Sequence, residues 1–195
     1  DINKKQKKHQ TQTLELLSIG KYEDRKNHLM LLKIFKQLLD EGFLINLTLI
    51  GEVSKEKHQK NFEICKHFIE INGLTERVNM RVNIPHSGIN EFYRLADLFI
   101  LPATEEPASI SILESVGQGT PAICSDTNGT QYYLLENKFG TTFRDNDPDS
   151  LFREIKLLLE DKRLEHFKEN IHLKIESILS KSNFYNSLML LIKDE

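Results

Sequence analysis

The sequence LPATEEPASISILESVGQGTP, residues 101–121, changes its hydrophobic pattern twice over a short distance. It begins at the end of the apolar run 98–101 and leads into a second apolar run, 122–124. Between the two runs, Ile110, Leu113 and Val116 recur at helical spacing. A strand, a helix and a second strand in this order are typical of an α/β protein. The helix N-terminus then lies just beyond the carboxyl end of a strand, where open α/β sheets bind their ligands.

The same alternation continues in both directions along the chain. Six short segments are predicted to be strands, at residues 14–19, 44–50, 77–82, 97–101, 122–124 and 141–143. Apolar stripes at helical spacing separate them, for example Leu31, Ile34, Phe35 and Leu38 before Gly42. From Pro148 onward we expect helix to the end of the chain. We therefore predict an α/β fold, with a doubly wound, Rossmann-like, six-stranded parallel sheet and extra C-terminal helices.

Length and composition limit the classes of protein that remain. A chain of 195 residues with 39% apolar residues can bury one substantial core. The net charge of −3 provides no general attraction for nucleic acid, so none is expected as a partner. No apolar run approaches the roughly 20 residues that a membrane helix needs. Cys65 and Cys124 do not make a disulfide framework, which favours a reducing, cytoplasmic location. Residues 1–13 are polar, and we interpret them as a linker.

Charged side chains cluster where strands end. Lys21, Arg25 and Lys26 follow the first strand, and they are either solvated loop residues or a site for an anion. The helix start at Ser109 has free N–H groups that suit a phosphate. Glu106 and Glu114 lie eight positions apart at this helix, where Glu114 could also be an ordinary surface carboxylate. Because phosphates repel carboxylates, the two acids are expected to meet hydroxyl groups. A sugar nucleotide has both chemistries.

Two other motifs fail on their context. The sequence GQGTPA, residues 117–122, matches a dinucleotide fingerprint in spelling, but it follows a helix and precedes a strand. The sequence DNDPDS, residues 145–150, imitates a calcium loop, but it is better interpreted as a helix start with Asp147 as the cap and Pro148 in the first turn. The histidines show no ligand spacing, and we predict no metal site.

The central stretch resembles a known family. Glu106 and Glu114 with seven residues between them, followed by Gly119 and Pro121, are similar to the Glu-x7-Glu signature of the retaining glycosyltransferases of family 4, which have the GT-B fold. The usual Glu-Gly-Phe-Gly is replaced here by EPAS at residues 106–109. This departure matters because proline offers no N–H and serine lacks the conformational freedom of glycine.

The resemblance implies that this chain is the C-terminal, donor-binding half of such an enzyme. Residues 14–180 would form the nucleotide-sugar-binding domain. Residues 181–195 would form a helix that crosses to an N-terminal acceptor domain not present in the chain. The resemblance also implies site residues, grouped by the part of the donor that they meet: Glu106 as the catalytic residue beside the sugar, Lys21, Lys26, Ser109 and Ile110 on the diphosphate, Glu114 on the ribose, and Gly51, Ile84 and Pro85 on the base side.

The implied reaction is transfer of a sugar from a nucleotide donor, UDP-linked in our prediction, with retained configuration and with no metal or other cofactor. The implied role is synthesis of bacterial surface polysaccharide or glycoconjugate at the inner face of the membrane. Any association with the membrane would occur only through the absent half. Two alternatives stay open: a degenerate GT-B domain kept for protein contacts, and a nucleotide-sugar epimerase of GT-B shape. A receiver-type signalling domain is disfavoured, because Gly20 and Lys21 stand where it needs an acidic cluster.

Overall fold

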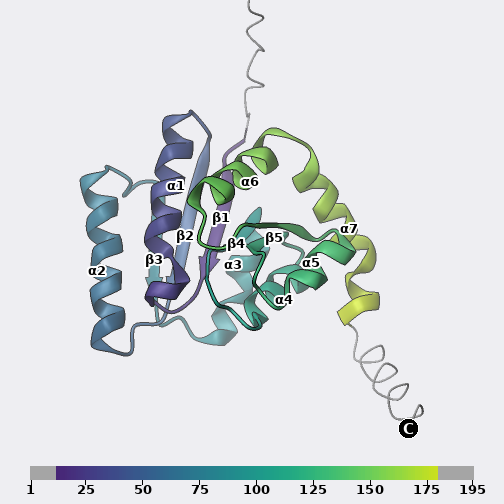
Figure 1. Cartoon of the computed structure of the whole chain (residues 1–195), viewed down its shortest axis with the longest axis horizontal. Coiled ribbons are helices and arrows are strands. Elements are labelled where there is room, and N and C mark those ends of the chain that lie inside the picture. The colour runs from purple at the N-terminus through teal and green to yellow at the C-terminus, as the bar shows by residue number, and fades with distance from the viewer. Residues whose placement is uncertain (1–11, 180–195) are drawn as a thin grey trace, which may run out of the picture.

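The computed structural model describes residues 12–179 and builds them around one parallel sheet (Figure 1). Its six strands are β1 (Leu14–Ile19), β2 (Ile45–Gly51), β3 (Val78–Val82), β4 (Leu98–Leu101), β5 (Ala122–Ser125) and β6 (Gly140–Phe143). They are arranged in the order β3-β2-β1-β4-β5-β6, and every neighbouring pair is parallel. The predicted doubly wound sheet is therefore confirmed.

Helices cover both faces of the sheet. They are α1 (His28–Asp40), α2 (Glu56–Ile71), α3 (Asn90–Leu95), α4 (Ile110–Gly117), α5 (Gln131–Asn137), α6 (Pro148–Glu160) and α7 (Arg163–Leu179). Two single 3-10 turns, η1 (Asp24–Lys26) and η2 (His86–Gly88), lie in the loops after β1 and β3. The buried side chains of α1, α2 and α6 share one core cluster, and those of α3, α4 and α5 share a second with Ile171 of α7.

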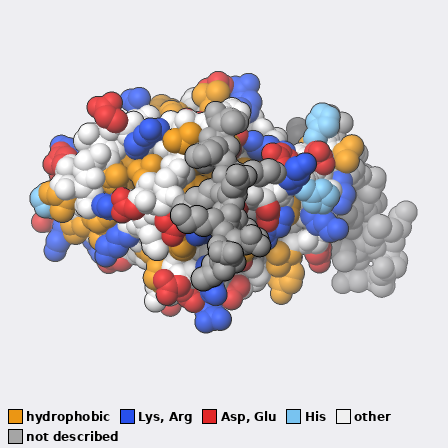
Figure 2. Space-filling view, turned by 90° about the horizontal axis from the view of Figure 1, so that it is seen from above, with side chains coloured by type: hydrophobic (Ala, Val, Ile, Leu, Met, Phe, Trp, Pro, Cys, Tyr) orange, Lys and Arg blue, Asp and Glu red, His pale blue; other side chains and the backbone are white. Residues whose placement is uncertain are grey.

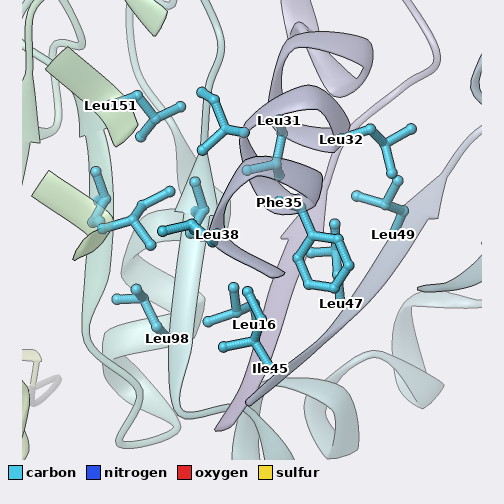
Figure 3. Packing of buried hydrophobic residues seen from close by; sticks show 14 of the residues in the cluster. Leu16, Leu31, Leu32, Phe35, Leu38, Ile45, Leu47, Leu49, Leu98 and Leu151 are labelled. Atoms are coloured by element: carbon cyan, nitrogen blue, oxygen red, sulfur yellow. The ribbon is translucent and has the colours of Figure 1, made fainter. Parts of the chain in front are cut away.

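The period of two along the strands explains why there are two clusters. Leu16 of β1 joins the cluster under α1, whereas its neighbour Leu17 joins the other. Figure 3 shows Phe35 and Leu38 of α1 directed toward the strand side chains of the first cluster. Phe35 and Leu38 are almost completely buried. Strands buried on both faces are nearly continuous apolar runs, as the sequence pattern predicted.

Within the described residues the C-terminal part is helical, as expected, with one interruption. The helix that starts at Pro148 ends at Glu160, and α7 begins at Arg163. Asp161 explains the interruption, because its backbone is extended and its Oδ1 accepts a hydrogen bond from the N–H of Arg163 at 2.7 Å. The expected cap of α6 is present, with the N–H of Ser150 donating to Oδ1 of Asp147 at 2.9 Å. The linker and crossing-helix predictions fall largely on residues 1–11 and 180–195, which lie outside the described residues.

The chain order reverses between β1 and β4, which are neighbours in the sheet although they are far apart in sequence. The loops that leave their carboxyl ends, 20–27 and 102–109, therefore lead away in opposite directions. Such a reversal point is where doubly wound proteins bind ligands. None of the helices within residues 12–179 is long and apolar enough to cross a membrane.

Candidate functional site

The loops after β1 and β4 are tied together by their backbones. The N–H of Thr104 donates to the carbonyl oxygen of Arg25 at 2.9 Å, and Nδ2 of Asn27 donates to the carbonyl oxygen of Pro102 at 3.0 Å. Asn27 has a positive φ of 54°, which ends η1 and lets α1 begin at once. The two loops thus form one continuous edge at the reversal point.

Glu106 lies at the centre of this edge and is held by two cations. Its Oε2 accepts hydrogen bonds from Nη1 of Arg25, at 2.7 Å, and from Nζ of Lys26. The side chains of Glu106 and Lys26 are only 10% and 12% exposed. Burial alone would raise the pKa of the Glu106 carboxyl, but the hydrogen bonds and charges of Lys26 and Arg25 outweigh it and lower the pKa below its usual value. Glu106 is therefore an ionised acceptor at neutral pH.

A second set of contacts fixes the loop between Glu106 and α4. The N–H of Gly129 donates to the carbonyl oxygen of Glu106 at 3.1 Å, and the N–H of Ser109 donates to Oγ1 of Thr130 at 2.7 Å. The two chain segments pass so closely that a Cβ on Gly129 would lie 1.8 Å from the carbonyl oxygen of Pro107. Gly129 is thus required by the close approach of the two backbone segments.

These contacts determine which backbone N–H groups at the start of α4 could donate to a phosphate. Because the N–H of Ser109 already donates to Thr130, its use by a phosphate would require that bond to be exchanged. Ile110 is the first helical residue, and its N–H has no hydrogen bond to any of residues 12–179. Its side chain is exposed. The diphosphate roles of Ser109 and Ile110 stay predictions, and the geometry favours Ile110.

Glu114 is held from the other side of α4. The hydroxyl of Tyr93 in α3 donates to Oε2 of Glu114 at 3.1 Å, and Nε2 of His86 lies 2.7 Å from its Oε1. Tyr93 is fully buried, while His86 is exposed. Burial, followed by the charge of Glu114, raises the pKa of the Tyr93 hydroxyl, which therefore stays a donor. The carboxylate of Glu114 is oriented before any ligand arrives.

The base-side residues lie around the ends of β2 and β3. A Cβ on Gly51 would lie 2.3 Å from the ring of Tyr22, so Gly51 has a packing role of its own. Lys21 lies near the end of β2, with its Nζ 3.3 Å from Oε2 of Glu52 and its side chain half exposed. Ile84 is partly buried, and Pro85 leads into η2, which carries His86 to Glu114.

The structure therefore brings the predicted residues together in two groups. Lys26 and Glu106 are in direct contact, and Glu114 is connected to the loop of Ile84 and Pro85 through His86. The sequence-based predictions included Arg25 only as one of three cations around a possible anion, and they did not include Tyr93 or His86. From the sequence, a tyrosine on the apolar stripe of a short helix is predicted to be a core residue, because hydrophobic periodicity does not show whether its hydroxyl has a partner.

Three further observations describe the surroundings of this edge. Among residues 12–179, no three His, Cys, Asp or Glu side chains are grouped as metal ligands would be. A pocket of about 500 Å³ lies on another part of the molecule, beside α1, α2 and the start of α6, and none of the predicted donor residues lines it. In Figure 2 acidic and basic side chains are interspersed over the visible face, so that face has no field of a single sign.

The comparisons with known proteins agree with the fold. The family model described as "Glycosyl transferases group 1" matches residues 1–174. The chain is 24% identical over 149 residues to the lipopolysaccharide core biosynthesis glycosyltransferase LpsE of Rhizobium meliloti, covering 76% of this chain and 40% of LpsE. The chain spans between 25% and 40% of the length of the curated relatives that it matches.

Solved structures show the same architecture. HepE of Anabaena in complex with UDP superimposes with a TM-score of 0.78 at 14% identity, over 94% of this chain and 49% of HepE. The C-terminal domain of LpcC, a glycosyl transferase group 1 family protein of Francisella tularensis, superimposes with a TM-score of 0.74 at 13% identity, over 85% of each chain. This chain therefore belongs to the glycosyl transferases group 1 family, and residues 12–179 have the Rossmann-like fold of a C-terminal GT-B domain.

Proposed function

We propose that this chain is the donor-binding half of a retaining glycosyltransferase and that its ligand is a sugar linked to a nucleoside diphosphate, with UDP favoured. One observation carries the proposal. Two carboxylates, Glu106 and Glu114, are held in place by their neighbours near the start of α4, and the cation Lys26 contacts Glu106. This arrangement pairs acceptors for hydroxyl groups with donors for phosphates.

Each group has a stated role in the proposal. Lys21, Lys26 and the N–H of Ile110 neutralise the diphosphate, which is the leaving group, so no metal ion is needed. Glu114 accepts hydrogen bonds from the ribose hydroxyls, because an ionised carboxylate can serve two donors at once. Glu106 faces the transferred sugar, and Gly51, Ile84 and Pro85 flank the base.

The wider setting is also a proposal. The relative LpsE, by its name, works in lipopolysaccharide core biosynthesis, which supports a role in bacterial surface polysaccharide or glycoconjugate synthesis in the cytoplasm. The acceptor would be bound by an N-terminal domain of the same polypeptide. Contact with the membrane would also be made by that domain.

A second candidate is a degenerate domain that is kept for protein contacts. It is favoured by the EPAS sequence at residues 106–109 and by the hydrogen bond that occupies the N–H of Ser109. Binding of a nucleotide separates the two candidates, because a degenerate site would have lost it.

The test is calorimetric titration of the chain with UDP, in the presence and absence of a chelator of divalent ions. We expect saturable binding that the chelator leaves unchanged. Binding that disappears with the chelator would contradict the metal-free site, and a complete lack of binding by UDP and GDP would favour the degenerate domain.

A further inference from the structure

The contact between Lys26 and Glu106 makes Lys26 less available to the diphosphate of the proposed donor. The ammonium of Lys26 is largely buried and already donates to Oε2 of Glu106. An ammonium that neutralises a carboxylate attracts a diphosphate less strongly. If Lys26 were the only cation beside Glu106, its movement to the diphosphate would leave a buried carboxylate without a cation, which is a costly state.

Arg25 can keep Glu106 neutralised when Lys26 leaves, because it contacts the same carboxylate oxygen of Glu106. Its Nη1 donates to Oε2 of Glu106 at 2.7 Å, so the carboxylate keeps one cation when the other leaves. A guanidinium has five donors and stays charged at all relevant pH values, whereas the lysine ammonium is a compact charge on a flexible stem. Arg25 is therefore suited to stay with Glu106, and Lys26 is suited to move.

The backbone around Arg25 supports this division. Its carbonyl oxygen accepts the N–H of Thr104 at 2.9 Å, and Asn27 is bound to Pro102 at 3.0 Å, which fixes the arginine beside the loop that carries Glu106. Nε of Arg25 also donates to Oε2 of Glu23 at 3.1 Å, so the guanidinium is oriented from its other side. Lys26 is the last residue of η1. A rotation of its side chain would be enough to move its ammonium from Glu106 to another partner, and the backbone would not have to move.

We propose that Arg25 is a positioning residue for the donor site: it holds and neutralises Glu106 so that Lys26 can exchange Glu106 for the donor diphosphate. This inference rests on the proposed function. It gives Arg25 an action through Glu106 rather than a direct contact with the nucleotide, and that difference can be measured.

The experiment is a double-mutant cycle on UDP affinity, measured by calorimetry for the parent chain, Arg25→Gln, Glu106→Gln and the double variant. We expect Arg25→Gln to weaken UDP binding about tenfold, a usual size of coupling between charges in contact. Glu106→Gln should bind UDP at least as tightly as the parent, because Lys26 is then released. In the Glu106→Gln background, adding Arg25→Gln should change the affinity less than about twofold.

Matched variants separate this role from general effects. Glu23→Gln removes the second carboxylate partner of Arg25 but not its charge, and it should weaken UDP binding less than Arg25→Gln does. Arg25→Lys keeps a charge within reach of Glu106 and should recover most of the affinity. If Arg25→Gln does not fold, as judged by its thermal unfolding, the same cycle is measured with Arg25→Lys, and its smaller loss should again vanish with Glu106→Gln.

Two outcomes would overturn the inference while leaving the proposed function intact. One is an equal loss from Arg25→Gln in both backgrounds, which would mean that Arg25 acts directly on the nucleotide charge. The other is a parent affinity retained by Arg25→Gln. If the parent chain itself does not bind UDP, the proposed function fails, and this inference fails with it.

Discussion

At the scale of single residues, both carboxylate oxygens of Glu114 have a side-chain partner. Its two oxygens face the buried hydroxyl of Tyr93 and the exposed ring of His86. Ribose hydroxyls would replace His86 at the exposed oxygen, while Tyr93 keeps the other oxygen in place. The binding energy of a nucleotide should thus depend on Glu114 more than on Glu106.

We expect Glu114→Ala to weaken UDP binding by roughly ten- to a hundredfold, because hydrogen bonds to a charged acceptor are worth roughly 1.5 to 3 kcal/mol. Tyr93→Phe should weaken it less, because it removes only the group that orients the carboxylate. Glu106→Ala should affect plain UDP least of the three. Calorimetry measures the UDP affinity of the three variants and of the parent. Equal UDP affinity of Glu114→Ala and the parent would refute the ribose role of Glu114.

His28 provides a pH-dependent prediction. It is buried at the start of α1, and its Nε2 lies 3.1 Å from the carbonyl oxygen of Gly20. Burial lowers its pKa from the ordinary value of 6.5 to about 4. Between these pH values the unfolded chain binds a proton that the folded protein does not. Stability from this residue is thus complete above pH 6.5 and is lost as the pH falls toward 4.

His28→Gln should flatten this dependence, since an amide can still donate to Gly20 but does not titrate. The parent should lose roughly 3 kcal/mol more than the variant between pH 7 and pH 4. Denaturant unfolding of both proteins across this range measures the difference, and an NMR titration of the His28 ring gives the folded pKa directly. The same loss of stability in both proteins would contradict the assignment.

At the scale of elements, the loop that precedes α4 depends on one close approach. Gly129 passes against Pro107 at the site where any Cβ would overlap a backbone oxygen. We expect Gly129→Ala to lower the free energy of unfolding by roughly 3 kcal/mol, because neither backbone segment can move alone. The hydrogen bond from Gly129 to Glu106 should be lost as well, with weaker UDP binding.

Gly88 is the matched control for this change. An added Cβ there would lie 3.4 Å from Cγ2 of Ile84, which is an ordinary contact, and its backbone needs no positive φ. Gly88→Ala should change the free energy of unfolding by less than about 0.5 kcal/mol. Thermal and denaturant unfolding compare the two variants. Similar losses at both positions would mean that the contact with Pro107 is not what makes Gly129 necessary.

The elements also show how far the sequence alone could lead. The inner strands β4 and β5 are short apolar runs buried on both faces, and all six strands were predicted to within one or two residues of their ends. The candidate site residues Lys21, Lys26, Glu106 and Glu114 could be identified from the family motif that the sequence resembles. Their partners did not follow, because Lys26 and Glu106 are far apart in the chain and meet only through the contacts of two irregular loops. Hydrophobic periodicity carries no information about such contacts.

At the scale of the whole molecule, the described residues form one six-stranded sheet with its helices and place the candidate site at one edge of that sheet. All predicted donor residues lie at the carboxyl side of one sheet, and the chain spans less than half the length of the curated relatives that it matches. It likewise corresponds to 49% of HepE and 85% of the isolated LpcC domain. If the proposed function holds, we expect this chain to bind the donor by itself.

Transfer is different, because it needs a second reactant in a fixed place. Holding donor and acceptor with their reacting atoms aligned is worth effective molarities of about 10⁵ M or more. That advantage is lost when only the donor is held. Water would also reach a diphosphate bound at an open edge and weaken the stabilisation of the leaving group that we propose for Lys21 and Lys26.

We therefore predict that the 195-residue chain binds UDP but transfers no sugar. The measurement is release of UDP from a panel of UDP-sugars in the presence of candidate acceptors, compared with Glu114→Ala, which should give the same background rate. UDP binding by the same preparation shows that the chain is folded during the assay. Turnover well above the Glu114→Ala background would show that one domain suffices, and that the acceptor is held by residues of this chain itself.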